Sequence, residues 1–370
     1  MSMRIYTMTH KKFTPLSDKL YVPLHVGRAC GEDFGYQGDD TGEQISALNC
    51  YYSELTGFYW IWKNCHDVDY VGTCHYRRYL INEKEQIYTE AEYRELLKKY
   101  DLVTTKKVQL NNSYYDGFSA NHNIWALEMT GKVIAEKYPE YADAFDTLVN
   151  GRQTYFGNIL VTSKKLFDEY ASWLFSIFFE VAERIELETG EDAYHKRVFG
   201  FISEFLLLVW VTVKKLRVYE CKVGMLGEKA ETGELKQRLA ECFRKRDVDL
   251  AKKIFLETRE MRPDVLMEAS DITGELHLCM QIIATAGEER CHGETMILER
   301  KNDFDRLIEI FSELNRIVSR YREDSQSTED ICFLKKEKIS GTAVWVAVMI
   351  GKESDSEKKD LLNRILKDLH

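Results

Sequence analysis

The pattern of apolar and polar positions predicts strands and helices that alternate through the first 227 residues. Short apolar runs are typical of buried strands: residues 3–8, 21–26, 70–74, 101–105, 155–161 and 217–223. Longer segments with apolar positions three and four residues apart predict helices: residues 45–64, 89–100, 124–137, 141–149, 163–186 and 197–215. Because short links join these elements, we predict an α/β domain with a mostly parallel sheet that helices flank on both faces.

The pattern of apolar and charged positions changes after residue 227. Residues 234–258 and 303–322 have the pattern of amphipathic, charge-laced helices, residues 342–350 form a short apolar segment, and residues 357–369 predict a final helix. We therefore divide the chain into residues 1–227, the α/β domain, and residues 228–370, a mainly α-helical C-terminal region. This region could form a homodimer, dock a partner or make peripheral contact with a membrane, and the sequence leaves these roles open.

An aromatic-rich stretch over residues 45–80 is expected to organise the α/β domain. Leu48, Tyr52, Leu55 and Tyr59 follow one another at helical spacing, which predicts one buried helical face. A short apolar strand comes next, and a polar block ends it abruptly: His75, Tyr76, Arg77 and Arg78.

The ends of two predicted strands carry a candidate anion-binding site. The polar block at residues 75–78 ends one strand, and the first strand ends in Thr9, His10 and Lys11. In a parallel sheet these carboxyl ends lie at the same edge, where ligands bind. Arginine forks and a lysine charge suit a diphosphate. The alternative is that the two arginines, Arg77 and Arg78, form ion pairs on a solvated turn with acidic neighbours such as Asp67 and Asp69.

A carboxylate inside the most apolar predicted helix is the second candidate. Glu204 lies within residues 197–215, where an unpartnered carboxylate would cost several kcal/mol or would have a raised pKa. We therefore consider Glu204 a candidate general base, or a partner for an active-site arginine. The alternative interpretation is a structural ion pair with Arg197 or Arg78.

Two further groups of residues could contact a ligand, and the second of them, Asn121 and His122, could contact sugar hydroxyls. Gly157 and Asn158 begin a predicted strand, at a glycine that would let a ligand approach the backbone closely. The alternative is an ordinary strand glycine in an aromatic core. Asn121 and His122 lie in the polar stretch 111–123, whose composition is typical of a functional loop.

The sequence gives little indication of a metal site. Asp67 and Asp69 form a DxD pattern, which holds a metal–diphosphate in many sugar transferases. They precede a predicted strand, however, whereas a metal-binding pair should follow one. The His and Cys residues lack the spacing of zinc ligands. We expect no metal, and we keep a divalent cation (Mn or Mg) at Asp67 and Asp69 as the weaker alternative.

Composition and charge narrow the classes of function. The 370 residues are 44% hydrophobic and 30% charged, as is ordinary for a globular protein. A formal net charge of −10 argues against a general nucleic-acid binder, which needs a basic footprint. Nine cysteines without a CxxC pair fit a reduced, cytoplasmic protein. The most apolar stretch, residues 201–213, is too short to span a bilayer, and no signal peptide is expected.

Several blocks of the sequence resemble a known family, in the same order along the chain. They are THK, YVPLHVG, ISALNCYYSELTGFYWIWKN, DYVGTCHYRRYL, YFGNILVTSKKLFDEYASWLF and RVFGFISEFLL. Together they resemble the bacterial capsular and exopolysaccharide biosynthesis domain, long catalogued as a domain of unknown function and now grouped with glycosyltransferases. The HYRRY sequence at residues 75–79 is the most specific of these blocks.

This resemblance implies a GT-A-like fold and transfer of a sugar from a UDP-sugar, with galactofuranose or galactose as the sugar in some family members. The end of the first strand, at Thr9, His10 and Lys11, would then line the nucleotide site, and Gly157 and Asn158 would border the acceptor. The block containing His75, Tyr76, Arg77 and Arg78 stands where GT-A enzymes usually carry DxD, so its cations would neutralise the diphosphate. Glu204 stands where a base or an acceptor-orienting carboxylate is expected.

We therefore predict a cytoplasmic glycosyltransferase, with the inner face of the membrane as its alternative location. Its acceptor would be a surface polysaccharide or a lipid-linked oligosaccharide, and its UDP-sugar donor would be a co-substrate, with no firmly implied cofactor. One alternative is a sugar-phosphate transferase, and another is a non-catalytic nucleotide- or carbohydrate-binding module of a polysaccharide assembly complex. No nucleic acid is expected as a partner.

Overall fold

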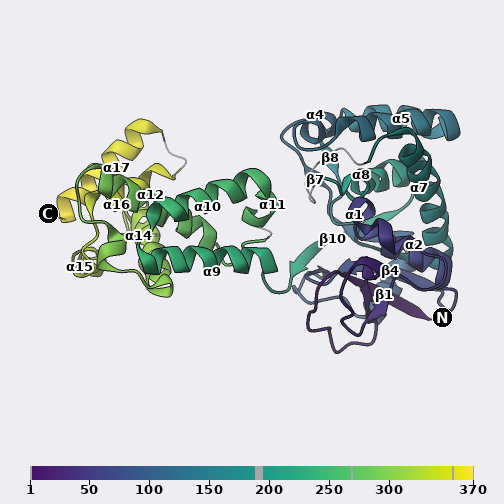
Figure 1. Ribbon diagram of the computed structural model, residues 1–370, viewed down its shortest axis with the longest axis horizontal. Helices are drawn as coiled ribbons and strands as arrows, with labels where there is room; N and C mark the ends of the chain where they lie inside the picture. Colours follow the sequence, from purple (N-terminus) through teal and green to yellow (C-terminus); the bar gives the residue numbers. More distant parts are fainter. Residues whose placement is uncertain (1, 188–194, 268–269, 352–353, 370) are drawn as a thin grey trace. The chain divides into compact units, whose positions relative to one another are not determined.

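The computed structural model describes residues 2–187, 195–267, 270–351 and 354–369 of the chain (Figure 1). Contacts within the chain divide it into two compact units, Met1–Leu226 and Gly227–His370. The division lies next to residue 227, where the pattern of apolar and charged positions in the sequence changes. Each unit has its own apolar core.

The first unit is built on a mixed sheet. Among the described residues the strand order is β3-β2-β1-β4-β5-β10-β6-β9, with β1 Met3–Thr9, β2 Tyr21–His25, β3 Gln37–Gly38, β4 Tyr70–His75, β5 Arg78–Ile81, β6 Leu102–Thr105, β9 Leu160–Ser163 and β10 Val218–Met225. Strand β1 is parallel to β2 and β4, β2 to β3, and β10 to β6. Strands β5 and β9 are antiparallel to their neighbours. The predicted α/β class is confirmed, but the sheet is not mostly parallel.

Two antiparallel strands account for this difference. The chain does not stop at the end of β4 but turns back at once as β5, a strand that the sequence analysis missed. Strand β9 also pairs with β4, with Tyr70 opposite Ser163 and Thr73 opposite Leu160. Strand β4 therefore pairs along one edge with two antiparallel strands, with β9 near its start and with β5 at its end.

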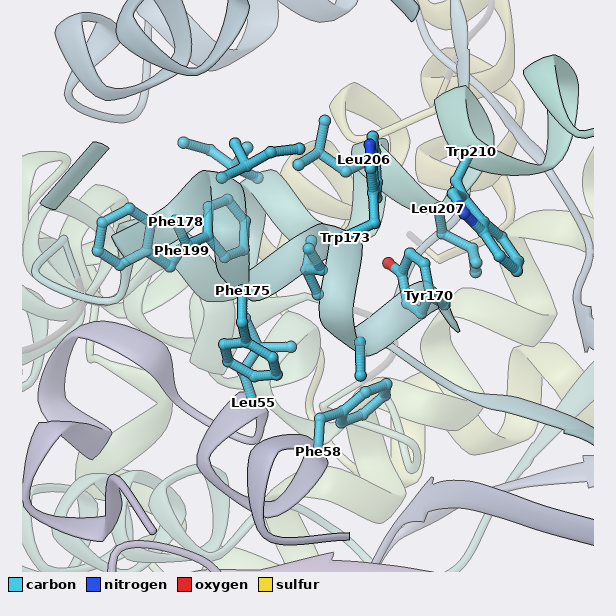
Figure 2. Close-up of a cluster of buried hydrophobic side chains, with 14 of the residues drawn as sticks. Leu55, Phe58, Tyr170, Trp173, Phe175, Phe178, Phe199, Leu206, Leu207 and Trp210 are labelled. Atoms are coloured by element: carbon cyan, nitrogen blue, oxygen red, sulfur yellow. The ribbon is translucent and has the colours of Figure 1, made fainter. Parts of the chain in front are cut away.

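Apolar cores lie on both faces of the sheet. Alternate residues of β1 belong to different cores, because successive side chains of a strand point to opposite faces: Tyr6 and Met8 to the larger core, and Ile5 to the smaller. The larger core includes side chains of α2 (Leu55–Asn64), α7 (Lys164–Arg184) and α8 (Val198–Val213), and Figure 2 shows Phe178 of α7 beside Phe199 of α8, with 4.8 Å between their ring centroids. The smaller core includes Tyr93 of α3 (Glu90–Leu97).

The helix predicted for residues 45–64 is broken in the middle. A 3-10 turn, Ser46–Leu48, leads into α1 (Asn49–Tyr52), and Ser53, with a φ of 50°, separates α1 from α2. Tyr52, Leu55 and Tyr59 are buried as predicted, whereas Leu48 is 39% exposed. The helical period does not continue across the break, so the position before it no longer lies on the buried face.

Other predicted helices are confirmed with small shifts at their ends. The Thr89–Glu92 capping box opens α3, and the Ser163 hydroxyl accepts a hydrogen bond from the Leu166 N–H at the start of α7. Two helices connected by a 3-10 turn, Pro139–Tyr141, are α5 (Ile124–Lys137) and α6 (Ala142–Val149). The expected polar loop at residues 111–123 contains a short helix, α4 (Tyr114–Ser119).

The strand predicted for residues 155–161 is only partly present. A small second sheet pairs β7 (Val108–Gln109) with β8 (Gln153–Thr154), and β9 begins at Leu160. Between them Gly157 has a φ of 94° and Asn158 a φ of 49°. Positive φ values do not fit an extended strand. The prediction that Gly157 and Asn158 begin a strand is therefore wrong, and both residues lie in a turn.

The second unit is helical throughout its described part. Its helices are α9 Ala230–Lys245, α10 Val248–Met261, α11 Pro263–Leu266, α12 Glu275–Cys291, α13 Ile297–Arg300, α14 Phe304–Arg322, α15 Thr328–Lys336, α16 Gly341–Met349 and α17 Asp355–Leu369. The single helix predicted for residues 234–258 is two helices, because Arg246 adopts the left-handed conformation and the Asp247 side chain caps α10.

Candidate active site

The polar block after β4 is a tight β-hairpin. His75 ends β4, Arg78 begins β5, and the two residues are paired across the strands, with only Tyr76 and Arg77 in the turn. Cross-strand partners carry their side chains on the same face of a sheet. The sharp reversal therefore brings the His75 imidazole and the Arg78 guanidinium to one face.

The two arginines of this hairpin differ in exposure. Arg77 is 6% exposed, and its carbonyl accepts a hydrogen bond from the Leu226 N–H at 2.8 Å. Arg78 is partly exposed, and within the described residues its side chain makes no ion pair or hydrogen bond. Asp67 instead pairs with Arg4, so the predicted alternative of an ion pair between Arg78 and Asp67 is wrong; the carboxyl group on which the charge of Arg78 acts is that of Glu204. Arg78 is available to bind an anion.

The end of β1 lies beside this hairpin, as the sequence predicts. Met8 is paired with His75, and the rings of His10 and Tyr76 are 5.8 Å apart between centroids. The Thr9 side chain is buried, and its hydroxyl is bonded to the backbone of Lys11, whose N–H lies 3.1 Å away. Thr9 therefore shapes the loop that presents His10 and Lys11 at the sheet edge.

Threonine hydroxyls hold the turn of residues 156–159 against the ends of two strands. Thr73 of β4 donates to the Asn158 carbonyl at 3.0 Å, and Thr104 of β6 donates to the Ile159 carbonyl at 2.6 Å. The turn therefore lies beside the part of β4 where pairing with β9 ends and pairing with β5 begins. A Cβ atom on Gly157 would be 4.0 Å from Nη1 of Arg78, so the turn and the free guanidinium are neighbours.

Glu204 of α8 meets the same turn. Its Oε1 accepts a hydrogen bond from the Gly157 N–H at 2.7 Å. Burial and the charge of Glu54 raise the pKa of Glu204 to about 8, although the Gly157 hydrogen bond and the charges of Arg78 and Arg197 act in the opposite direction. A carboxyl group with a pKa near working pH is suited to general base catalysis.

Glu54 is a site residue that the sequence analysis missed. It follows Ser53 at the break between α1 and α2, and its Oε1 accepts a hydrogen bond from Nδ2 of Asn158 at 2.7 Å. Asn158 also donates to the Gly200 carbonyl and accepts from the Ser203 hydroxyl, so its amide joins three elements. The sequence pattern predicted one continuous helix over residues 45–64, and within such a helix nothing distinguishes Glu54 from any other glutamate.

The other predicted sugar contacts, Asn121 and His122, lie between α4 and α5. His122 stacks on Phe201, with 4.1 Å between ring centroids, and burial lowers the pKa of His122 to about 4. The Asn121 amide donates to the Gly117 carbonyl, within its own helix turn. Phe201 and Glu204 are three residues apart on one helix, so they lie on the same side of α8. The structure therefore places His122 near this row of side chains and leaves Asn121 at the surface.

The two aspartates of the DxD pattern lie at the other end of β4. Asp67 pairs with Arg4 at 2.9 Å, and the Asp69 carboxylate accepts a hydrogen bond from the Ser2 N–H. Strand β4 has six residues, which separates these aspartates from His75 by roughly 20 Å. Within the described residues, no three His, Cys, Asp or Glu side chains form a group that could hold a metal ion.

A family model matches residues 4–215, under the description "Domain of unknown function (DUF4422)". The chain belongs to this family. The matched residues contain the hairpin, the turn and Glu204, so the candidate site lies in the DUF4422 domain. The match ends before β10, and the second unit lies outside it.

The DUF4422 domain is similar to a solved glycosyltransferase. The apo structure of WbbM, a bifunctional glycosyltransferase, is 30% identical to this chain, with a TM-score of 0.58. The likeness covers 62% of this chain and 46% of the WbbM chain, so the present chain spans less than half the length of that protein. No curated protein matches the sequence. The similarity supports a glycosyltransferase role in general.

In the part of the chain that the structure describes, no helix combines the length and the apolar character needed to cross a bilayer.

Proposed function

We propose that this DUF4422 protein transfers a sugar from a nucleoside diphosphate donor, a UDP-sugar, to a hydroxyl group of a glycan or lipid-linked glycan. Galactose and galactofuranose are the sugars that the family resemblance favours. The similarity to WbbM supports the reaction class. The geometry at the sheet edge supports the assignment of roles to individual residues.

One observation carries the proposal: an unpaired cation lies beside a carboxyl group of raised pKa. Arg78 makes no ion pair among the described residues, and Glu204 is bonded to the Gly157 N–H next to it. An arginine fork binds phosphate oxygens in bidentate fashion. With His10 and His75 at the same edge, the site can receive a diphosphate and still present a proton acceptor.

The reaction follows from these positions. The acceptor oxygen attacks the anomeric carbon and gives its proton to the Glu204 carboxylate. The bond between that carbon and the diphosphate breaks, and the diphosphate leaves with the bonding electron pair. Arg78, with His75 beside it, stabilises the charge that develops on the leaving group, which is the usual contribution of preorganised cations to such steps.

In this proposal Arg78, with His75 beside it, neutralises the diphosphate. Asp67 and Asp69 are the weaker candidates for a divalent cation, because Arg4 and the Ser2 N–H already contact them at the opposite end of β4. A chelator separates the two possibilities in solution.

The first test is a donor screen. The full chain is incubated with UDP-, GDP-, dTDP- and CMP-sugars and with candidate glycan acceptors, with and without EDTA, and the released nucleotide is identified. We expect release of UDP that withstands EDTA. Release of a nucleoside monophosphate would show a sugar-phosphate transferase, and loss of turnover in EDTA would contradict the metal-independent site.

The Arg78→Ala variant tests the anion role. Loss of the guanidinium removes charge stabilisation in the transition state, so we expect kcat/KM to fall by about 100-fold or more. Arg238→Ala is the matched control, because Arg238 is an exposed arginine on α9 of the second unit. Equal rates in the two variants would contradict the role of Arg78, and tight UDP binding without turnover would favour a non-catalytic binding module.

A further inference from the structure

The corner between α1 and α2 holds an unusual backbone conformation. Ser53 has φ 50° and ψ −133°, a region that non-glycine residues rarely adopt. Its carbonyl accepts hydrogen bonds from Nδ2 of Asn49 at 2.7 Å and from the Thr56 hydroxyl at 3.1 Å. Such strain persists where the surrounding structure fixes it, and it often lies at functional sites.

This corner packs directly on the helix that carries Glu204. A Cβ atom on Gly200 would lie 3.0 Å from Oγ of Ser53 and 3.8 Å from the Tyr52 carbonyl oxygen, so the glycine lets α8 approach the corner closely. Gly200 lies four residues before Glu204, about one helical turn. The packing therefore fixes the corner relative to Glu204.

Two carboxyl groups bind one two-residue turn as a result. Glu204 accepts the Gly157 N–H, and Glu54 accepts the side-chain amide of Asn158. The oxygen of that amide, Oδ1, accepts a hydrogen bond at 2.9 Å from the hydroxyl of Ser203, the residue next to Glu204 in the chain. Gly157 adopts its positive φ without steric cost, and Asn158 at φ 49° is a non-glycine residue in the left-handed region.

We propose that Glu54 is a positioning residue for Glu204: its negative charge and its bond to Asn158 keep Glu204 a strong proton acceptor in the transfer step. The inference rests on the proposed function and adds a residue to it. In the reaction above, the proton from the acceptor hydroxyl goes to Glu204, so no further reactant is needed.

The charges that face Glu204 make this role specific. Arg78 of β5 and Arg197, just before α8, favour its ionised form, and Glu54 opposes it. Tyr114 of α4 stays neutral, since burial and Glu204 raise its pKa. Among these neighbours, Glu54 carries the negative charge. A like charge close to a carboxyl group disfavours its ionisation.

The test follows the titration of Glu204 itself. Carboxyl ¹³C chemical shifts are recorded against pH in the glutamate-labelled full chain, and the Glu204 signal is assigned by its loss in Glu204→Gln. We expect a midpoint near pH 8 in the wild-type chain. In Glu54→Gln, which keeps an oxygen acceptor for Asn158, we expect the midpoint to fall by about 0.5 units or more. Where the donor screen gives turnover, the acidic limb of kcat/KM should move by the same amount.

Two further variants separate charge from structure. Glu54→Asp keeps the charge and should keep the midpoint raised, while Glu183→Gln, at an exposed position of α7, should change nothing. An unshifted Glu204 midpoint in Glu54→Gln would overturn the inference. So would an ordinary midpoint near pH 4 in the wild-type chain, which needs no variant to fold. The titration needs no donor, so a silent donor screen would count against the proposed function alone.

Discussion

At the residue scale, the site depends on what surrounds a few charged side chains. Arg77 and Arg78 are adjacent in the sequence, yet one is buried and bonded through its carbonyl to Leu226, while the other is partly exposed and makes no ion pair among the described residues. The two arginines have the same side chain and the same neighbourhood in the sequence. The hairpin turn alone decides which of them can meet a ligand.

Glu204→Gln should separate stability from activity. The unfolded chain releases this proton near pH 4.3 and the folded chain only near pH 8, so the wild-type chain loses stability as pH rises through this window. A glutamine has no proton to release, and we expect it to raise the free energy of unfolding by about 1–3 kcal/mol at pH 8 and by little at pH 4. Turnover should fall by about 100-fold or more.

Urea unfolding at the two pH values measures this difference. The same stability change at pH 4 and pH 8 would contradict the raised pKa. Glu183→Gln again serves as the control, since its exposed carboxylate has no role in the site.

At the element scale, most helices and strands follow from local patterns. The caps at Thr89 and Ser163 are confirmed where the sequence places them, because a side-chain oxygen can accept a hydrogen bond from an otherwise unpaired N–H three residues later at the start of a helix. The failures lie at the break after Tyr52, at the β5 strand and at the turn of residues 156–159. In each case distant partners hold the backbone: α8, β10 and the threonines of β4 and β6.

Ser53→Gly tests the strain at the helix break. Glycine adopts a positive φ without the steric cost of a Cβ atom, so we expect the free energy of unfolding to rise by about 1 kcal/mol. Ser53→Ala keeps the Cβ atom and should not gain stability. Denaturant unfolding of the two variants decides the point, and a loss of stability in the glycine variant would show that Ser53 is held without strain.

At the scale of the whole molecule, the sheet extends beyond the matched family residues. The DUF4422 match ends at residue 215, but β10 (Val218–Met225) lies inside the sheet between β5 and β6. The Leu226 N–H is then bonded to the Arg77 carbonyl of the hairpin. The second unit has a separate core, so the first unit need not depend on it. Homodimerisation or membrane contact through the second unit stays a prediction.

Truncation tests this boundary. A chain ending at Gly227 keeps β10 and should unfold cooperatively, whereas a chain ending at Leu216 leaves β5 and β6 without their shared neighbour and should not fold. Circular dichroism and thermal unfolding of the two fragments give the answer. Cooperative unfolding of the shorter chain would show that β10 is dispensable.

Local patterns in the sequence are enough to predict the α/β class of the first unit, the helical character of the second, and the meeting of His10 with the HYRR block. These follow from apolar periodicity and from the rule that parallel strands end at one edge. Three features come from tertiary contacts instead: β5 turns back, Arg78 rather than Arg77 is available, and Glu54 joins Glu204 at one turn. Those outcomes depend on hydrogen bonds and close packing between residues far apart in the chain, which no local pattern contains.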